Sequence, residues 1–322
     1  MKDSKILVSI CCITYNHAQY IRQCLDGFLM QETNFAFEIL IHDDASTDGT
    51  ADIIREYEKK YPNVIKPIYQ EENQYSKGVN ITEKYNWSRV KGKYVAQCEG
   101  DDYWIDSQKL QRQVDFMEAN LEYNLSAENA LVQHINGQSW EFSSKPTRDV
   151  TTTELLTQRQ FPTASVLFKA NLLTAINRFE GPKFDTFTWT YMSQNGKIHY
   201  SNIVSSVYRR GGGITEADKV RWAYLVETYN QNMYDKLNIP KHIIKERNKT
   251  QVGDCYNGYL AARKQGRYNV AFDLLLKCFR YDMFFFITFY IFGENCYNNY
   301  ITFKRSVKSV FKKMLKCLRL WD

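Results

Sequence analysis

Three carboxylates within four residues form the most distinctive chemical cluster of the sequence. Glu99, Asp101 and Asp102 follow the apolar run 94–98, and two aromatic residues come directly after them. Carboxylates this close repel one another, so proteins keep them together mainly where a cation neutralises their charge. The cluster therefore predicts a divalent metal site, with a solvated acidic loop as the alternative.

Two further polar segments end apolar runs in the N-terminal half. Thr-Tyr-Asn (14–16) follows the run 6–13, and His-Asp-Asp-Ala-Ser-Thr-Asp-Gly-Thr (42–50) follows the run 37–41. Each run is typical of a buried strand in a parallel sheet. Taken alone, the first polar segment is typical of a turn and the second of a capped helix start.

Helical segments alternate with these strands. Apolar residues at helical spacing predict helices within 20–29 and 53–57, and a further helix at 109–120. Additional strands are expected at 64–69 and 94–98. This alternation predicts an α/β fold in which helices flank a sheet with parallel strands. Ligands bind at the carboxyl ends of such strands, so we expect the three polar segments to line one pocket.

In this order, the three segments resemble the motifs of glycosyltransferase family 2. The resemblance covers residues 5–215, about two thirds of the chain. It implies the GT-A fold, a Rossmann-like mixed sheet flanked by helices. It also implies an inverting transferase that uses a nucleotide-sugar donor and a divalent cation, Mn²⁺ or Mg²⁺.

The resemblance assigns the acidic cluster to the family's metal and diphosphate site. Asp102 is the expected direct ligand of the metal, and Asp101 lies beside it in the same motif. Glu99 stands where the family usually has an Asp, and its longer side chain suits binding through a water molecule. A cation held there would offset the charge that develops on a departing diphosphate.

The resemblance also implies a nucleotide site. Tyr15 matches the residue whose ring lies against the base, and Asp44 matches the acid that accepts a hydrogen bond from the base edge. Uracil offers an N–H group to a carboxylate, which favours UDP, although dTDP shares that edge. Asp43 is interpreted either as loop support or as a ligand contact. The predicted nucleotide-sugar contacts are Thr14, Tyr15, Asn16, Asp44, Ser46, Asp101 and Arg209.

Asp185 matches the family's catalytic base, which removes the proton of the attacking acceptor hydroxyl. In the family such an Asp precedes a helix, a glycine, a strand and a Tyr-Arg pair. Here those features correspond to a helix ending near Gly196, a strand at 197–200, and Tyr208-Arg209. Residues 161–168 resemble the strand that precedes this region.

Two positions near this base have more than one interpretation. Trp189 is either a platform for the acceptor sugar or a core residue. Many relatives carry a histidine shortly after the Tyr-Arg pair, whereas Gly211 occupies that position here. This leaves Arg209 or Arg210 as possible diphosphate contacts.

The net charge of +6 is concentrated at the C-terminus. Residues 303–322 contain seven basic residues and one acid, and the rest of the chain is balanced, which argues against a nucleic-acid partner. The apolar residues of this tail lie at helical spacing, which predicts an amphipathic helix in an anionic membrane surface. The alternative is a helix packed on its own domain with a solvated basic face.

Composition sets the remaining expectations. The eight cysteines show no framework spacing, which favours reduced thiols in the cytoplasm, and the run 6–13 is interpreted as a strand and not as a signal sequence. The predicted organisation is a catalytic domain at 1–215, a helical accessory domain at 216–302 and the tail at 303–322. The apolar run 283–292 is too short to span a bilayer.

Together these features predict a metal-dependent hexosyltransferase at the inner face of the bacterial cell membrane. It would move a sugar from a nucleotide sugar, UDP-linked by preference, to a hydroxyl of a glycan or lipid-linked acceptor in surface polysaccharide synthesis, such as that of a capsule or lipopolysaccharide. One alternative is a non-catalytic, membrane-associated scaffold with the same fold. Another is a sugar nucleotidyltransferase, although the sequence has no glycine-rich, basic phosphate loop near its N-terminus.

Overall fold

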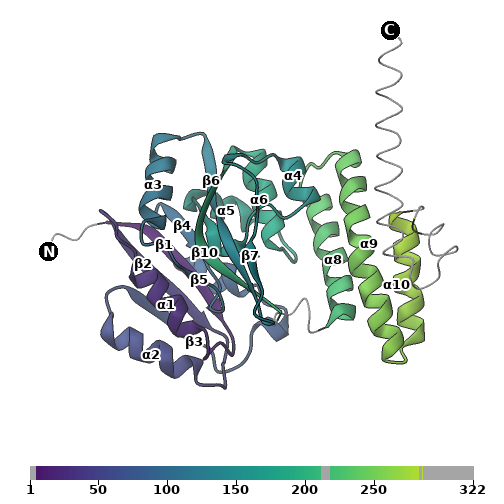
Figure 1. Cartoon of the computed structure of the whole chain (residues 1–322), viewed down its shortest axis with the longest axis horizontal. Coiled ribbons are helices and arrows are strands. Elements are labelled where there is room, and N and C mark those ends of the chain that lie inside the picture. Colours follow the sequence, from purple (N-terminus) through teal and green to yellow (C-terminus); the bar gives the residue numbers. More distant parts are fainter. Residues whose placement is uncertain (1–4, 212–217, 283–284, 286–322) are drawn as a thin grey trace, which may run out of the picture. The chain divides into compact units, whose positions relative to one another are not determined.

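The computed structural model describes residues 5–211, 218–282 and 285. The chain divides into two compact units, residues 1–212 and 213–322. The first unit contains one ten-stranded sheet and its flanking helices, and the described part of the second unit is helical (Figure 1).

The N-terminal half of the sheet is parallel, as the sequence predicts. β1 pairs with β2 and β4, and β2 pairs with β3, all in parallel. In this register Thr14, the last residue of β1, lies opposite Asp43, the last residue of β2. The two predicted nucleotide segments therefore start at the same edge of the sheet. The strand bounds are Ile6–Thr14 (β1), Ala36–Asp43 (β2), Ile65–Tyr69 (β3) and Tyr94–Gln97 (β4).

The second half of the sheet is mixed. β9 is antiparallel to both β4 and β6, and β10 runs parallel to β6 but antiparallel to the short strand β5. The strand order is β3-β2-β1-β4-β9-β6-β10-β5, with β7 paired to β6 and β8 to β10. The bounds are Tyr103–Trp104 (β5), Tyr123–His134 (β6), Ser139–Glu141 (β7), Arg148–Asp149 (β8), Val166–Lys169 (β9) and Lys197–Arg210 (β10).

Two local expectations for this half need correction. The strand expected at 197–200 and the Tyr208-Arg209 pair belong to one continuous strand, β10, because β6 pairs with it along most of its length. The strand expected from residue 161 begins only at Val166, because a 3₁₀ turn at Thr163–Ser165 follows Pro162. Proline lacks the N–H group that strand pairing requires, which limits its place in a sheet.

Helices cover both faces of this sheet (Figure 1). α1, α2 and α3 pack on one face, against β1 residues Val8, Ile10 and Cys12, while the other side of β1 presents Cys11 to a second core that includes α4, α5 and α6. Side chains of a strand alternate between its faces, which explains this division. The bounds are Ile21–Leu29 (α1), Thr50–Lys60 (α2), Lys109–Ala119 (α3), Thr152–Thr157 (α4), Leu173–Ile176 (α5) and Asp185–Gln194 (α6).

Short turns of other helix types occur at Tyr75–Lys77, Trp87–Arg89 and Ala170–Leu172 (3₁₀) and at Thr82–Asn86 (π).

Trp189 is buried in the second core. The centre of its ring lies 5.5 Å from the ring centre of Phe168 and 6.3 Å from that of Phe161. This burial assigns Trp189 to the core and removes it as an acceptor platform.

The described part of the second unit contains three helices, which agrees with the predicted helical C-terminal region. They are α8 (Lys219–Lys236), α9 (Lys241–Lys264) and α10 (Tyr268–Tyr281). Gly258 permits their close packing, because a Cβ atom there would lie 3.1 Å from side-chain atoms of Ala223 and Leu274.

Across the described ranges, no helix is long and apolar enough to cross a bilayer. The tail predicted at 303–322 lies outside the described residues.

Gly27 permits the contact between α1 and the strand that follows the acidic cluster. A Cβ atom at Gly27 would lie 2.8 Å from the backbone oxygen of Trp104 and 2.9 Å from its nitrogen. We expect Gly27→Ala to lower the free energy of unfolding by about 1–3 kcal/mol, despite the better helix propensity of alanine. Urea denaturation measures this, and a gain in stability would contradict the predicted clash.

Candidate active site

The loops after β1 and β2 are joined by direct hydrogen bonds. The backbone N–H of Asn16 donates to Ser46 Oγ at 2.8 Å, and the N–H of Thr47 donates to Asn16 Oδ1 at 2.8 Å. Ala18 N–H donates to Asp48 Oδ2 at 2.9 Å. The structure thus brings the predicted residues Asn16 and Ser46 together, and their polar groups hold the two loops in place.

Tyr15 and Asp44 differ sharply in exposure. The side chain of Tyr15 is 45% exposed, as a ring that stacks on a base requires, whereas Asp44 is buried. The Asp44 carboxylate accepts backbone N–H bonds from Gln74 at 2.8 Å and Tyr75 at 3.0 Å. Asp44 therefore fixes the loop after β3, and its contact with a nucleotide base stays a prediction.

Asp43 supports its own loop. Its Oδ2 accepts the N–H of Ser46 at 3.1 Å, and its Oδ1 is buried without a hydrogen-bond partner among the described residues. Burial raises the pKa of this carboxyl above its usual value. Of the two interpretations of Asp43, loop support is therefore observed.

Gly100 brings the acidic cluster against the end of β1. Its N–H donates to the Ile13 carbonyl at 2.9 Å, and a Cβ atom there would lie 2.7 Å from Thr14 Oγ1 and 3.1 Å from His17 Nδ1. Only a residue without a side chain fits this approach. The acidic cluster and the predicted nucleotide segment at 14–16 are consequently adjacent.

The three acids of the cluster are held in an unfavourable electrostatic environment. Burial, followed by the charges of Asp101 and Glu99, raises the pKa of Asp102 well above its ordinary value. Burial also raises the pKa of Glu99 to about 8, with further contributions from Asp101 and Asp185. Asp101 Oδ1 is buried and has no hydrogen-bond partner in the described part of the chain.

These features fit a divalent cation, which would satisfy the unpaired oxygen of Asp101 and reduce the repulsion among the three acids. Oxygen ligands of this kind suit Mg²⁺ and Mn²⁺. Within the described ranges, however, no three His, Cys, Asp or Glu side chains already converge as a metal site. The assignment of Asp102, Asp101 and Glu99 as ligands thus remains a prediction.

Arg209 attaches the acidic cluster to β10. Its backbone N–H donates to Asp102 Oδ1 at 2.8 Å, and its guanidinium donates to the backbone oxygen of Asp101. The guanidinium carbon lies 4.7 Å from the ring centre of Tyr20 and 4.4 Å from that of Tyr103. Arg209 therefore orients the cluster, and its direct contact with a diphosphate stays a prediction.

Asp185 begins α6 and is positioned by a neighbouring loop. Its Oδ2 accepts a hydrogen bond from Thr163 Oγ1, and the same hydroxyl accepts one from Arg159 Nη2 at 3.3 Å. Asp185 also lies close enough to Glu99 to raise the pKa of that carboxyl. The predicted base and the predicted metal cluster consequently share one region of the molecule.

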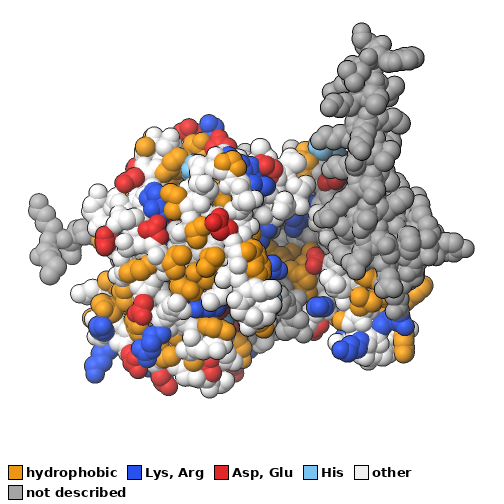
Figure 2. Space-filling view, viewed as in Figure 1, with side chains coloured by type: hydrophobic (Ala, Val, Ile, Leu, Met, Phe, Trp, Pro, Cys, Tyr) orange, Lys and Arg blue, Asp and Glu red, His pale blue; other side chains and the backbone are white. Residues whose placement is uncertain are grey.

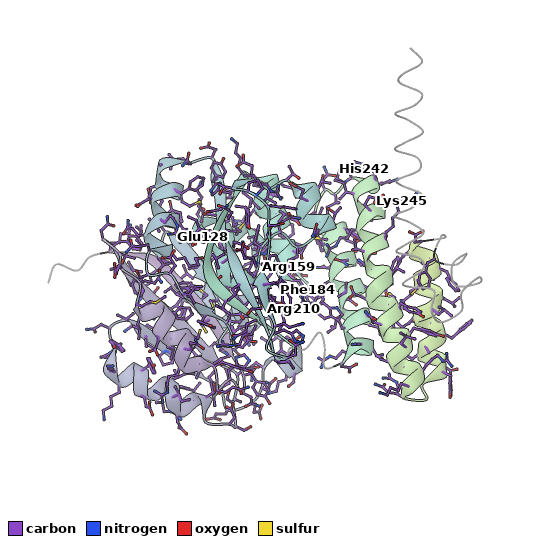
Figure 3. The ribbon with its side chains drawn as sticks, in the orientation of Figure 1. Glu128, Arg159, Phe184, Arg210, His242 and Lys245 are labelled. Carbon is purple, nitrogen blue, oxygen red and sulfur yellow. The ribbon has the colours of Figure 1, made fainter. Side chains whose placement is uncertain are left out.

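Arg159 is a site residue that the sequence analysis missed. It donates to the Tyr208 hydroxyl at 2.9 Å, and although burial opposes its charge, Tyr208 and Asp185 raise its pKa. Its charge also lowers the pKa of Glu99 and Asp102. Figure 3 shows Arg159 near Phe184, the residue before Asp185. Arg159 does not belong to any of the motifs identified in the sequence. The sequence shows only that it is a basic residue a few positions before the turn at 163–165.

The sheet topology and the site together define a GT-A type protein. The sequence model described as "Glycosyl transferase family 2" matches residues 9–168, and the chain belongs to this family. The matched range contains the acidic cluster and both nucleotide loops but ends before Asp185.

Curated relatives support this assignment. An uncharacterized protein of Mycobacterium tuberculosis (strain H37Rv) is 39% identical over 170 residues, 50% of this chain and 46% of that protein. The putative teichuronic acid biosynthesis glycosyltransferase TuaG of Bacillus subtilis is 38% identical over 117 residues, 36% of this chain and 44% of that protein. The match thus spans about half the length of such relatives.

Another relative is similar over more of its length. The UDP-Glc:alpha-D-GlcNAc-diphosphoundecaprenol beta-1,3-glucosyltransferase WfaP of Escherichia coli is 29% identical over 216 residues, 67% of this chain and 82% of that protein.

Solved structures share the fold. TarS 1-349 of S. aureus in complex with UDP-GlcNAc superposes with a TM-score of 0.60 at 17% identity, covering 94% of this chain and 92% of that one. The mannosyltransferase PcManGT of Pyrobaculum calidifontis, in complex with GDP-Man and Mn²⁺, gives 0.57 at 16% identity, covering 85% and 80%. At this identity the likeness establishes the fold alone.

The raised pKa of Glu99 predicts a pH dependence of stability in the absence of divalent cations. The folded protein keeps this proton up to about pH 8, whereas the unfolded chain releases it near 4.5. The folded state thus binds more protons between these values, and stability falls as pH rises, by at most about 1.4 kcal/mol per pH unit from this group.

Glu99→Gln should therefore flatten the decline of the thermal midpoint between pH 5 and pH 8 in EDTA. Glu71→Gln, at an exposed residue outside the site, is the matched control and should retain the wild-type slope. Identical slopes for Glu99→Gln and wild type would contradict the placement of this carboxyl.

Proposed function

We propose that this protein transfers a sugar from a nucleoside diphosphate sugar to a hydroxyl group, with inversion at the anomeric carbon. The observation that carries the proposal is that one short segment links Asp185 to the acidic cluster (Glu99, Asp101, Asp102). Thr163 donates to Asp185 Oδ2, and the carbonyl of the next residue, Ala164, accepts from Trp104 Nε1 at 2.8 Å, two residues after Asp102. The paired loops that follow β1 and β2 adjoin the cluster. A donor diphosphate and an acceptor hydroxyl need these two kinds of group within reach of one another.

The donor is proposed to be a UDP-sugar, with dTDP-sugars as the alternative that shares the base edge. The exposed ring of Tyr15 would stack on the base, and Asp44 would accept its N–H. Thr14, Asn16 and Ser46 would shape the adjoining surface. The UDP-GlcNAc bound by TarS and the UDP-Glc in the name of WfaP support this choice, and the GDP-Man bound by PcManGT makes GDP the next candidate.

Asp102 and Asp101 would hold a Mn²⁺ or Mg²⁺ ion, with Glu99 bound to it directly or through water. The ion would offset negative charge on the departing nucleoside diphosphate. The contribution of the chain is to hold these acids in place through the backbone N–H of Arg209 and the close approach of Gly100 to Thr14.

Asp185 would accept the proton of the acceptor hydroxyl as its oxygen attacks the anomeric carbon and the bond from that carbon to the diphosphate breaks. Thr163 donates to Asp185 Oδ2 and so leaves Oδ1 available for the acceptor. Arg159, linked to Thr163 and Tyr208, would keep this carboxylate oriented and offset the charge of the neighbouring acids.

The acceptor is proposed to be a glycan or lipid-linked sugar of a bacterial surface polysaccharide, used at the cytoplasmic face of the membrane. The diphosphoundecaprenol acceptor in the name of WfaP and the teichuronic acid pathway in the name of TuaG support this class. Contact of the tail at 303–322 with anionic lipid belongs to the same proposal.

Calorimetry of UDP binding tests the donor site. Wild type should bind UDP more tightly with Mn²⁺ than in EDTA, and Asp102→Asn should lose about tenfold or more of the Mn²⁺-dependent affinity. Asp115→Asn, an exposed substitution of the same chemistry on α3, is the matched control and should bind as wild type does. Failure of UDP, dTDP and GDP to bind under every condition would refute the proposal.

Asp185→Asn tests the catalytic base. This variant should bind UDP with unchanged Kd but release UDP from UDP-sugars roughly 100-fold more slowly or worse when a diphosphoundecaprenol-linked acceptor is present, because its amide cannot accept the proton. Asp115→Asn should retain wild-type turnover. A wild-type protein that bound UDP but showed no transfer to any acceptor would favour the scaffold alternative, and full turnover by Asp185→Asn would exclude this residue as the base.

A further inference from the structure

The described helical unit exposes an apolar stripe along α10. Tyr268, Phe272 and Leu276 are spaced four residues apart and are 68%, 63% and 45% exposed. The opposite side of α10 is also apolar, because Ala271, Leu274 and Cys278 are buried in the core of the unit. A helix that is apolar on two sides needs a partner for its outer side.

Basic residues adjoin this stripe at the turn between α9 and α10. Arg263, Lys264 and Arg267 lie within a stretch, 255–272, that has no acidic residue. Figure 2 shows hydrophobic and basic side chains next to each other at this end of the helical unit. Among the described residues, no carboxylate forms a salt bridge with Lys264 or Arg267. A hollow of about 390 Å³ opens beside Arg267 and Tyr268.

Acids occur on α9 and α10 outside the turn that joins these helices. Asp273 accepts a hydrogen bond from the Tyr224 hydroxyl of α8 at 2.7 Å, and Asp254 accepts one from Trp222 Nε1 at 3.3 Å. Lys277, the next cation along α10, pairs with Glu227 at 2.5 Å. The turn between α9 and α10 therefore has three cations and no acid, and Asp273, the first acid along α10, lies 3.9 Å from Lys277, which offsets part of its charge.

We propose that this surface, the α10 patch (Arg263, Lys264, Arg267, Tyr268, Phe272 and Leu276), docks on an anionic lipid bilayer. Phe272 and Leu276 would enter the boundary between headgroups and acyl chains, and Tyr268 would lie at the level of the headgroups, where its hydroxyl stays hydrated. The three cations would contact lipid phosphates, with Arg267 at the edge of the hollow.

Docking of the α10 patch on lipid is a proposal separate from the transfer reaction, and it involves residues other than the tail at 303–322. It is tested by sedimentation of the full chain with phosphatidylglycerol–phosphatidylcholine vesicles and with phosphatidylcholine vesicles, without any nucleotide sugar. Failure to bind lipid would thus leave the proposed sugar transfer untouched and would contradict only the lipid contacts of the α10 patch and of the tail. The measurement is repeated in a chain in which Lys308, Lys312, Lys313 and Lys316 are replaced by Gln, to reduce attraction by the tail.

Phe272→Asp should weaken binding to the phosphatidylglycerol vesicles about tenfold, because it removes buried apolar surface and adds a repelled charge. The double variant Lys264→Glu/Arg267→Glu should lose the preference for phosphatidylglycerol over phosphatidylcholine. Leu121→Asp, at an apolar residue of the first unit that is 67% exposed, is the matched control and should bind like its parent. Circular dichroism checks that each variant is folded.

Three results would overturn the proposal. The first is a parent chain that binds neither vesicle. The second is equal binding by parent, patch variants and Leu121→Asp. The third is a change of oligomeric state in Phe272→Asp on analytical ultracentrifugation with unchanged vesicle binding, which would assign the stripe to a contact between two copies of the chain.

Discussion

The repulsion among the acids of the cluster is the physical constraint on which the site depends. Glu99, Asp101 and Asp102 lie within one turn, and Asp185 lies near enough to act on the same charges. Such an arrangement costs folding free energy unless the acids are protonated or neutralised. The fold limits this cost with one backbone N–H group, that of Arg209, and with the nearby cation of Arg159. The proposed cation would remove this repulsion, which is the physical argument for assigning a metal to the cluster.

The rest of the first unit holds this cluster next to the loops that we assign to the nucleotide. Parallel pairing aligns the ends of β1 and β2, and the bonds between Asn16, Ser46 and Thr47 keep the two loops together. Asp44 extends the same support to the loop at 73–75. Because these bonds restrict the loops, the proposed binding of a nucleotide would need to order little additional backbone.

The family match covers only part of the chain, and this part contains some of the assigned site residues but not others. The family match ends at residue 168, after the acidic cluster and before Asp185 and the helical unit. The matched part contains the groups that we assign to the donor and metal. The part beyond it contains the proposed base and the α10 patch, where acceptors and locations would differ between proteins.

The sequence by itself determined the strands and helices of the first half, since apolar periodicity reports which side of each element is buried. It also placed the polar segments at the strand ends and predicted the helical C-terminal region.

Only the tertiary structure decided which distant residues meet. The bond from Arg209 to Asp102 joins positions 107 residues apart, and the contacts of Arg159 with Thr163 and Tyr208 depend on where β10 lies in the sheet. The burial of Trp189 against Phe168 likewise follows from the packing of α6 on β9. Local periodicity encodes the face that an element buries but not the order of strands, and strand order determines these contacts.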